Sequence, residues 1–404
     1  MDRPDLVIVG GGILGLATAK ALLESLPHLR LLLLEKELQL ASHQTGHNSG
    51  VIHSGLYYPP GSQKARFCQA GRSLLLDFAK EQGLAHQVPG KLVLATRDPE
   101  VPLLEALKAR GEANGLTGLE LLDRAGIKRI EPWAQGVKGL YVPQTGIIRY
   151  LEVAQAFARQ VRERGGEIRL GERALDYDPQ TLRLRTSLGK YSTPALVVCA
   201  GLGTNPWLGA KAKQVRILPF RGDYRKLSPQ AAQKINGLIY PVPNPALPFL
   251  GVHLTPDLEG GVHCGPNAVF SFAQEGYRPG DWNWQDTKSA FLFPGTWALF
   301  ARHWRLGLAE LGRAASKGRF LADLQQLCPP IQAQDLLPSP SGVRAQAVDL
   351  SGALVEDFWV ELGPKQLTLV NAPSPAATSA LALGRHLAQL ARLKLLGERG
   401  DQAV

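Results

Sequence analysis

The stretch Leu6-Val7-Ile8-Val9-Gly10-Gly11-Gly12-Ile13-Leu14-Gly15, close to the start of the chain, decides the fold. Four apolar residues followed by glycine are typical of a buried parallel strand, and the glycines form a G-x-G-x-x-G motif. Apolar residues from Leu16 to Leu26 then recur at helical spacing, Pro27 ends that segment, and a second apolar run covers residues 29–34. The order strand, glycine turn, helix, strand predicts a Rossmann-type unit.

Each glycine of the motif has a physical reason to be there. Gly10 permits the turn, Gly12 lets backbone N–H groups approach a pyrophosphate, and Gly15 lets the helix pack closely on the strand. Glu35 ends the second strand twenty residues after Gly15, where an acidic side chain can accept hydrogen bonds from ribose hydroxyls. The pattern predicts a dinucleotide site.

Two features of the chain order favour FAD over NAD. The glycine motif opens the chain, and a second strand followed by a glycine comes much later, at Val197-Val198-Cys199-Ala200-Gly201. This order is typical of two-domain flavoproteins, so FAD is the cofactor that we expect.

The composition indicates a globular protein with an anionic partner. Of 404 residues, 45% are hydrophobic and 20% charged, which is enough for two cores. Four cysteines show no pairing pattern, which argues against a disulfide framework or a zinc ribbon and fits a reducing compartment. The net charge of +10 favours a polyanion, an acidic membrane surface or a dicarboxylate. The strand at Leu6 leaves no room for a signal peptide, and no apolar run approaches the roughly 18 residues of a membrane span, so we expect a cytoplasmic protein.

The order of elements predicts an α/β fold with two discontinuous domains. We expect a Rossmann-type FAD-binding domain from residues 1–80, 145–205 and 335–404, closed by a helix at 376–396. Residues 81–144 and 206–334 should form a second, α+β substrate domain on a mainly antiparallel sheet, because much of this part is rich in proline, glycine and short β-like runs.

Several blocks outside the glycine motif resemble one known family. The run HQTGHNSGVIHSGLYY at 43–58 is similar to the L-2-hydroxyglutarate dehydrogenase/oxidase family, within the D-amino-acid-oxidase-like flavoproteins. The other matching blocks are PFRGDY at 219–224, YPVP at 240–243, GVH at 251–253, GPNA at 265–268, GVRAQA at 342–347 and NAPSPAATS at 371–379. The resemblance implies non-covalent FAD, a flavin between the two domains and an L-2-hydroxy acid on its face. The chain departs from the family near 297–313 and in a shortened segment before Leu367.

The motif and the resemblance together predict a cofactor site but no metal site. The residues expected to bind FAD are Gly10, Gly12, Ile13, Leu14, Gly15, Glu35, Lys36, Thr45, His47, Asn48, Ser49, Gly50, Ala200, Gly201, Pro373, Ala376 and Thr378. The turn at 371–379 should place the start of the last helix near the flavin, where its dipole would stabilise negative charge. His43 and His47 are four residues apart, as two ligands on a helix would be, but Gly46 indicates a loop instead.

Two histidines and two arginines are the candidates for substrate chemistry. Either His53 or His253 could be the base that takes the hydroxyl proton, and the alternative for each is an ordinary buried histidine. Arg221 and Arg344 lie in apolar or glycine-rich surroundings and could hold the carboxylates of a dicarboxylate, although surface ion pairs would satisfy them equally. Supporting donors, or else packing residues, are Tyr57, Tyr58, Tyr224 and Asn267.

The predicted reaction is FAD-dependent oxidation of L-2-hydroxyglutarate to 2-oxoglutarate, with a hydride passing from C2 to flavin N5. Electrons would go to oxygen or a membrane quinone, the latter through peripheral contact at the cytoplasmic face of the inner membrane. The alternatives are a related enzyme acting on glycerol 3-phosphate or an amino acid, and a non-catalytic flavin-binding redox sensor. Arginine and tryptophan interleave at 297–305, but the helical spacing of Trp297, Trp304, Leu308 and Leu311 predicts a packed or interfacial helix and no nucleic-acid partner.

Overall fold

The first domain is built on a six-stranded sheet with the order β22-β23-β13-β1-β2-β9 in the computed structural model, which describes residues 3–243 and 251–397. The strands are β1 (Leu6–Val9), β2 (Leu31–Leu34), β9 (Glu167–Arg169), β13 (Leu196–Val198), β22 (Trp359–Leu362) and β23 (Gln366–Asn371). Neighbouring strands are parallel, apart from the antiparallel edge pair of β22 and β23. This is the sheet that the glycine motif predicts.

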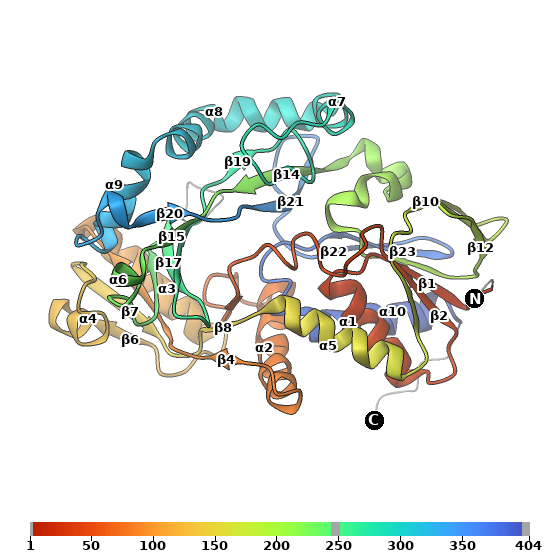
Figure 1. Ribbon diagram of the computed structural model, residues 1–404, viewed down its shortest axis with the longest axis horizontal. Coiled ribbons are helices and arrows are strands. Elements are labelled where there is room, and N and C mark those ends of the chain that lie inside the picture. The colour runs from red at the N-terminus through yellow and green to blue at the C-terminus, as the bar shows by residue number, and fades with distance from the viewer. Residues whose placement is uncertain (1–2, 244–250, 398–404) are drawn as a thin grey trace.

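The side chains of β1 point alternately into two hydrophobic cores, one on each face of the sheet. Leu6 and Ile8 pack under the helices α1 (Ile13–Ser25), α5 (Tyr150–Glu163) and α10 (Ala380–Lys394), which lie together on one face (Figure 1). Val7 and Val9 face the other side. That side is covered by a small sheet of β10 (Ala174–Asp178), β11 (Arg183–Thr186) and β12 (Lys190–Ser192). A strand buried on both faces explains the continuous apolar run.

The second domain is built on an eight-stranded sheet with the order β20-β15-β18-β17-β16-β5-β7-β6. Its strands are β5 (Lys91–Ala95), β6 (Glu120–Leu122), β7 (Lys138–Val142), β15 (Arg225–Leu227), β16 (Leu238–Pro241), β17 (His253–Pro256), β18 (Val262–Gly265) and β20 (Leu336–Pro338). All neighbours are antiparallel except β5 and β16, so the prediction of a mainly antiparallel sheet is confirmed. The helices around it are α3 (Val101–Ala113), α4 (Arg124–Ile130), α6 (Pro229–Ala232) and α9 (Lys317–Leu327).

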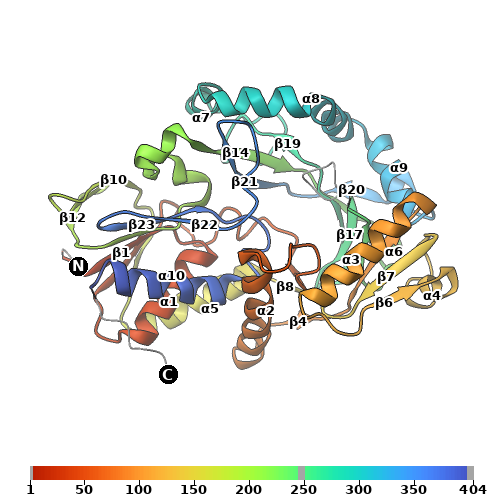
Figure 2. The same ribbon diagram turned by 180° about the vertical axis from the view of Figure 1, so that it is seen from behind.

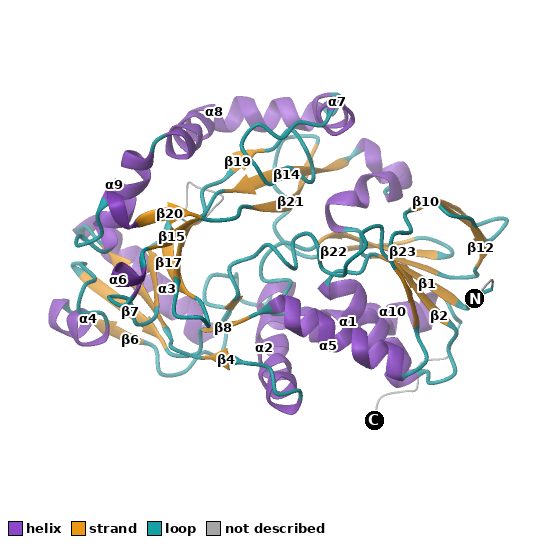
Figure 3. Ribbon diagram, viewed as in Figure 1, coloured by secondary structure: helices purple, strands orange, loops and turns teal. Residues whose placement is uncertain are grey.

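Smaller elements join the two domains. A three-stranded sheet of β19 (Val269–Phe270), β14 (Val215–Gly222) and β21 (Gly342–Asp349) lies between the large sheets and the long helix α8 (Pro294–Ala315), which follows α7 (Trp284–Phe291) along one outer edge (Figure 2). Below it are α2 (Gln63–Glu81) and the sheet of β3 (Val51–Ile52), β8 (Gly146–Ile148) and β4 (His86–Gln87). The remaining elements are the 3₁₀ helices Asp98–Glu100, Gly201–Trp207, Gly209–Lys213 and Ala333–Asp335. Loops face one another between the two large sheets (Figure 3).

The structure differs from the expected element limits in three places. Strands β20 and β21 lie inside the range expected for the FAD domain but pair with β15 and β14. The last helix begins at Ala380 rather than 376, because residues 373–379 form successive turns in which Ala376 and Ser379 donate to proline carbonyls. The helix whose spacing was noted from Trp297 to Leu311 extends beyond these residues, from Pro294 to Ala315, and α9 follows after Ser316, whose side chain caps it. None of the helices in the described part of the chain is both long and apolar enough to cross a bilayer.

Candidate active site

A cavity of about 600 Å³ connects the two domains. One end is lined by Gly10, Gly12 and Glu35 of the first domain, and the other by Tyr240 and His253 of the second. Its size and its mixed apolar and polar lining are typical of a cofactor or ligand site. Of the residues expected to bind FAD, all line it except Gly15 and Gly50.

The glycine turn leaves the start of α1 open toward this cavity. Gly10 has φ +109°, and a side chain there would lie 2.4 Å from the carbonyl oxygen of Cys199. A Cβ on Gly15 would lie 2.0 Å from the Gly10 oxygen, so Gly15 serves packing rather than lining. The N-cap residue Gly12 supplies no side-chain cap, and Leu14 of the first turn lines the cavity. An open helix N-terminus with this backbone suits a pyrophosphate.

Glu35 presents a carboxylate that is held by backbone amides. Its Oε2 accepts a hydrogen bond from Gly11 N–H at 2.7 Å and its Oε1 accepts one from Glu37 N–H at 2.9 Å. The side chain is buried yet lines the cavity. Each oxygen keeps a further lone pair, so the group fits the ribose role predicted for it.

A charged cluster spans the two domains at the cavity rim. The Lys36 ammonium contacts the carboxylates of Glu37 and Glu275 and lies 2.9 Å from His43 Nε2. Glu37, His43 and Glu275 offer ligand atoms within 4.8 Å of one another, but the ammonium already holds the position of a cation among them. The cluster is therefore better suited to an ion-pair network than to a metal.

Tyr277 of the second domain completes this contact. Its hydroxyl lies 2.9 Å from His43 Nδ1, and its ring stacks on that of His47 at 4.2 Å between centroids. Glu275 lines the cavity from the same loop. We call the loop 271–283 the rim loop. It lies against the segment 36–47, which carries several predicted cofactor residues.

His53 is held where the turn after β23 meets α10. Its backbone N–H donates to Thr378 Oγ1 at 3.1 Å, and the Thr378 hydroxyl lies 2.8 Å from that of Tyr150. The imidazole Nε2 lies 3.2 Å from Ser374 Oγ. Burial, followed by the charge of Lys91, lowers the pKa of His53 to about 3. Thr378 thus ties the start of the last helix to the predicted catalytic loop.

His253 is fixed in one tautomer. Its Nδ1 lies 2.8 Å from the Gly251 carbonyl oxygen, which can only accept, so Nδ1 carries the proton and Nε2 keeps a lone pair. The ring stacks on Tyr240, with 3.9 Å between centroids. Burial above all, with the charges of Arg344 and Lys91, lowers the pKa of His253 to about 3 against the opposing effect of the Gly251 hydrogen bond. The imidazole is neutral at physiological pH.

Arg344 and the tyrosines form the rest of this end. Arg344 lines the cavity from β21, and its hydrogen bond to Tyr224 opposes the burial that raises the pKa of that phenol. Burial raises the pKa of Tyr57 and Tyr58 well above the usual value. The Tyr57 hydroxyl is buried and has no hydrogen-bond partner within the described residues. These phenols are neutral donors at the cavity wall.

The structure places Arg221 and Asn267 outside the cavity lining, in contrast to the prediction that they contact substrate. Arg221 Nε donates to Asp223 Oδ1 at 2.7 Å, and its Nη1 donates to the Arg278 carbonyl at 2.8 Å. Asn267 Oδ1 accepts from Asp223 N–H at 2.7 Å. Asp223 therefore satisfies both side chains, and the Arg221 guanidinium anchors the rim loop.

Sequence reasoning missed three residues at this end. Tyr240 stands in a quoted block, but nothing in its sequence surroundings indicates that it stacks on His253. Lys64 lines the cavity with its ammonium 5.6 Å above the Tyr58 ring, and Ser374 contacts His53. These residues come from separate elements, and no spacing along the chain predicts that they meet.

Comparisons with known proteins agree with this geometry. The family model described as FAD dependent oxidoreductase matches residues 5–390. An L-2-hydroxyglutarate dehydrogenase of Indibacter alkaliphilus is 42% identical over 94% of this chain and 96% of its own length, and that of Escherichia coli K12 is 42% identical over 95% and 92%. The mitochondrial enzyme of the same name from Homo sapiens is 40% identical over 95% of this chain and 88% of its own.

Solved structures share the fold at lower identity. L-alpha-glycerophosphate oxidase from Mycoplasma pneumoniae, solved with FAD bound, has a TM-score of 0.78 at 22% identity and covers 99% of this chain and 96% of its own. Glycine oxidase from Geobacillus kaustophilus has a TM-score of 0.73 at 17% identity, covering 99% and 100%. Taken with the sequence relatives, these findings show that the chain belongs to the L-2-hydroxyglutarate dehydrogenase family within the FAD dependent oxidoreductases.

Proposed function

We propose that this protein is an FAD-dependent enzyme that oxidises L-2-hydroxyglutarate to 2-oxoglutarate. The observation that carries the proposal is that one continuous cavity has both ends of the expected site. It runs from the glycine turn that suits a pyrophosphate to a pocket with Arg344 and two neutral histidines. The relatives that are 40–43% identical over about 95% of the chain carry the name of this activity. When bound, FAD supplies the acceptor for the hydride that leaves C2.

His253 is our candidate for the base. Its Nε2 lone pair is available because Nδ1–H is committed to the Gly251 carbonyl, so it can take the hydroxyl proton as C2 is oxidised. His53 Nε2 already lies 3.2 Å from Ser374 Oγ, which leaves its tautomer open. His53 is better placed to orient the substrate hydroxyl or the turn at 373–378. The sequence left this pair open, and the fixed tautomer of His253 supports the choice proposed here.

Arg344 is our candidate for holding a substrate carboxylate. Its planar guanidinium suits a carboxylate bidentately, and it also donates a hydrogen bond to the Tyr224 phenol oxygen at the cavity wall. Lys64 and the hydroxyl of Tyr57 are the further donors at this end. A dicarboxylate thus meets cations and neutral phenols rather than acidic side chains.

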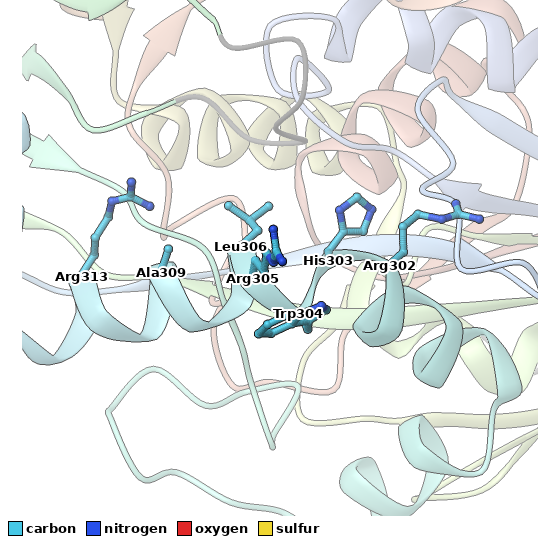
Figure 4. A pocket seen from close by; sticks show the side chains of 7 residues that line it. All are labelled: Arg302, His303, Trp304, Arg305, Leu306, Ala309 and Arg313. Carbon is cyan, nitrogen blue, oxygen red and sulfur yellow. The ribbon is translucent and has the colours of Figure 1, made fainter.

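A quinone is the electron acceptor that the surface favours. The helices α7 and α8 and the link between them carry six large apolar side chains that are each more than half exposed: Trp284, Leu292, Trp297, Trp304, Leu308 and Leu311. We call this set the α7–α8 face. Figure 4 shows Trp304 pointing to the opposite side of α8 from Arg302, His303, Leu306 and Arg313. An exposed face of tryptophan and leucine opposite a basic face is typical of a helix at a membrane interface, the region beside the apolar layer in which quinones dissolve.

A substrate panel tests the proposed reaction. The holoenzyme is assayed with a dye acceptor on L-2-hydroxyglutarate, its D enantiomer, L-lactate, glycerol 3-phosphate and glycine. We expect kcat/KM for L-2-hydroxyglutarate to exceed the others by about a hundredfold or more. A higher value for glycerol 3-phosphate or glycine would assign the protein to one of the related activities, and no turnover of any substrate would favour a sensor.

A further inference from the structure

Lys91 is a buried cation that the proposed reaction does not use. It is the first residue of β5 and is 1% exposed. Side chains alternate along β5, and Leu92 and Leu94 pack in the core below α9 while Val93 and Ala95 pack with Tyr240. Lys91 therefore points to the Tyr240 face of the sheet, where it approaches the cavity wall from behind.

The Lys91 ammonium contacts two aromatic faces. Its Nζ lies 4.2 Å from the ring centroid of Tyr57 and 5.0 Å from that of Tyr240. No carboxylate within the described residues forms an ion pair with it. Cation–π contacts stabilise an ammonium, but a buried charge without a counter-ion remains costly. The described residues thus leave the protonated form of Lys91 without an anionic partner.

Both aromatic rings belong to the substrate end of the cavity. Tyr57 and Tyr240 line it, and Tyr240 stacks on the candidate base His253. The charge of Lys91 lowers the pKa of both His53 and His253, which places it close to the two imidazoles. An anionic ligand in front of the tyrosines would supply the missing negative charge.

We propose that Lys91 is a positioning residue for the anionic substrate, and that the site binds a dicarboxylate in the form in which Lys91 is protonated. The ammonium holds the Tyr57 and Tyr240 rings that carry the wall of the site, and it attracts the substrate carboxylates through them. This inference rests on the proposed function, because it requires an anionic substrate at this end of the cavity.

The surroundings of Lys91 make its charge sensitive to pH near neutrality. Burial lowers the pKa of Lys91 to about 7, against an opposing effect of Cys68. The titratable and charged groups around it are His53, Tyr57 and Tyr58 after β3, Lys64, Cys68 and Arg72 on α2, Tyr240 on β16, His253 on β17 and Arg344 on β21. The two histidines are neutral above about pH 3, and burial raises the pKa of Cys68 to about 12 and those of the three tyrosines as well. The core between β5 and α3, which includes Leu104 and Leu107, is apolar and, in the described part of the chain, brings no charge near Lys91.

The sign of the expected effect follows from linkage. A dicarboxylate favours protonated Lys91, so the pKa of Lys91 rises in the complex. Binding then takes up a proton when the free protein has lost it, and the affinity falls as the pH rises through about 7. An arginine at this position would stay charged and remove the pH dependence while keeping the affinity.

The test is an equilibrium titration of the holoenzyme with glutarate, an unreactive dicarboxylate, followed by the flavin absorbance at about pH 6 to about pH 9. We expect the wild-type Kd to rise about tenfold or more over this range. Lys91→Met should bind weakly and without this pH dependence, and Lys91→Arg should bind tightly throughout. Lys64→Met is the comparison variant: it removes the other lysine at this end of the cavity, so it should weaken binding at every pH while the change of Kd with pH stays as in the wild type.

Two results would overturn the assignment. One is a wild-type Kd that does not change with pH, which needs no variant and so does not depend on how variants fold. The other is a Lys91→Met profile that parallels the wild type. Oxidation of L-2-hydroxyglutarate with either result would reject the role of Lys91 alone, whereas an enzyme that neither oxidises it nor binds glutarate would reject both this inference and the proposed function.

Discussion

At the scale of single residues, two side chains of the same type differ in which of their atoms remain available to a ligand after their hydrogen bonds within the protein are made. His253 and His53 are both neutral, but a carbonyl fixes the proton of His253 on Nδ1, while His53 faces a hydroxyl that can donate or accept. Arg344 and Arg221 are both arginines in the quoted blocks, but Asp223 and a backbone carbonyl satisfy Arg221 outside the cavity. Residue type and spacing predicted these candidates from the sequence. The two members of each pair can be told apart only by their hydrogen-bond partners in the structure.

The two arginines give a direct comparison. Arg344→Met should raise KM for L-2-hydroxyglutarate by about tenfold to a thousandfold, because a charge-assisted contact to a carboxylate is lost in a buried site. Arg221→Met should change KM by about threefold or less and act mainly on stability, by about 1 kcal/mol. Steady-state kinetics and thermal unfolding of both variants decide this. The reverse pattern, with KM sensitive only to Arg221, would restore the prediction made from the sequence.

At the scale of elements, the sequence was most informative where a segment has its own local signal. The strand β1, the glycine turn and α1 were predicted because each requires residue types that few other structures need. The start of α10 was placed too early, because alanines at 376 and 377 read as helix while the prolines before them fold into turns. The rim loop had no signal at all, since its contacts depend on a partner segment more than 200 residues away.

The rim loop predicts a change in cofactor retention. Tyr277→Ala should speed FAD release about tenfold, because it removes the stack on His47 and the hydrogen bond to His43 at the cavity rim. Flavin fluorescence after dilution measures the rate. Tyr177→Phe is the control, since that tyrosine bonds to Thr193 in the small sheet of the first domain and should leave the release unchanged. Equal release from Tyr277→Ala and wild type would mean that the rim loop does not retain the cofactor.

At the scale of the whole molecule, the site exists only where the two domains meet. The chain passes between them several times, so Glu35, His253 and Arg344 approach one cavity although they are far apart in sequence. The apolar patterns predicted the two sheets, because the pattern within one strand already indicates which of its faces are buried. They could not predict Lys91 behind the tyrosines, because a lysine that begins a short strand has the same sequence pattern whether it is buried or exposed. Convergence of this kind is a property of the tertiary structure.

The α7–α8 face predicts membrane contact at this scale. Replacing Trp304 and Leu308 together with serine should lower sedimentation with anionic phospholipid vesicles by about tenfold, since the exposed apolar side chains would no longer enter the interface. Leu188→Ser is the matched control, because Leu188 is 74% exposed on the turn between β11 and β12. Turnover with a soluble dye should be unchanged. Sedimentation of the double variant at the wild-type level would exclude this face as the contact surface.

The central claim, that the cavity oxidises L-2-hydroxyglutarate at C2, is tested most directly by mixing the purified holoenzyme with that acid in the absence of oxygen. The account predicts loss of the oxidised flavin absorbance, formation of one equivalent of 2-oxoglutarate per flavin, and slower bleaching when deuterium replaces hydrogen at C2. The D enantiomer should leave the flavin oxidised. A flavin that stays oxidised with the L enantiomer, or that both enantiomers bleach at the same rate, would contradict it.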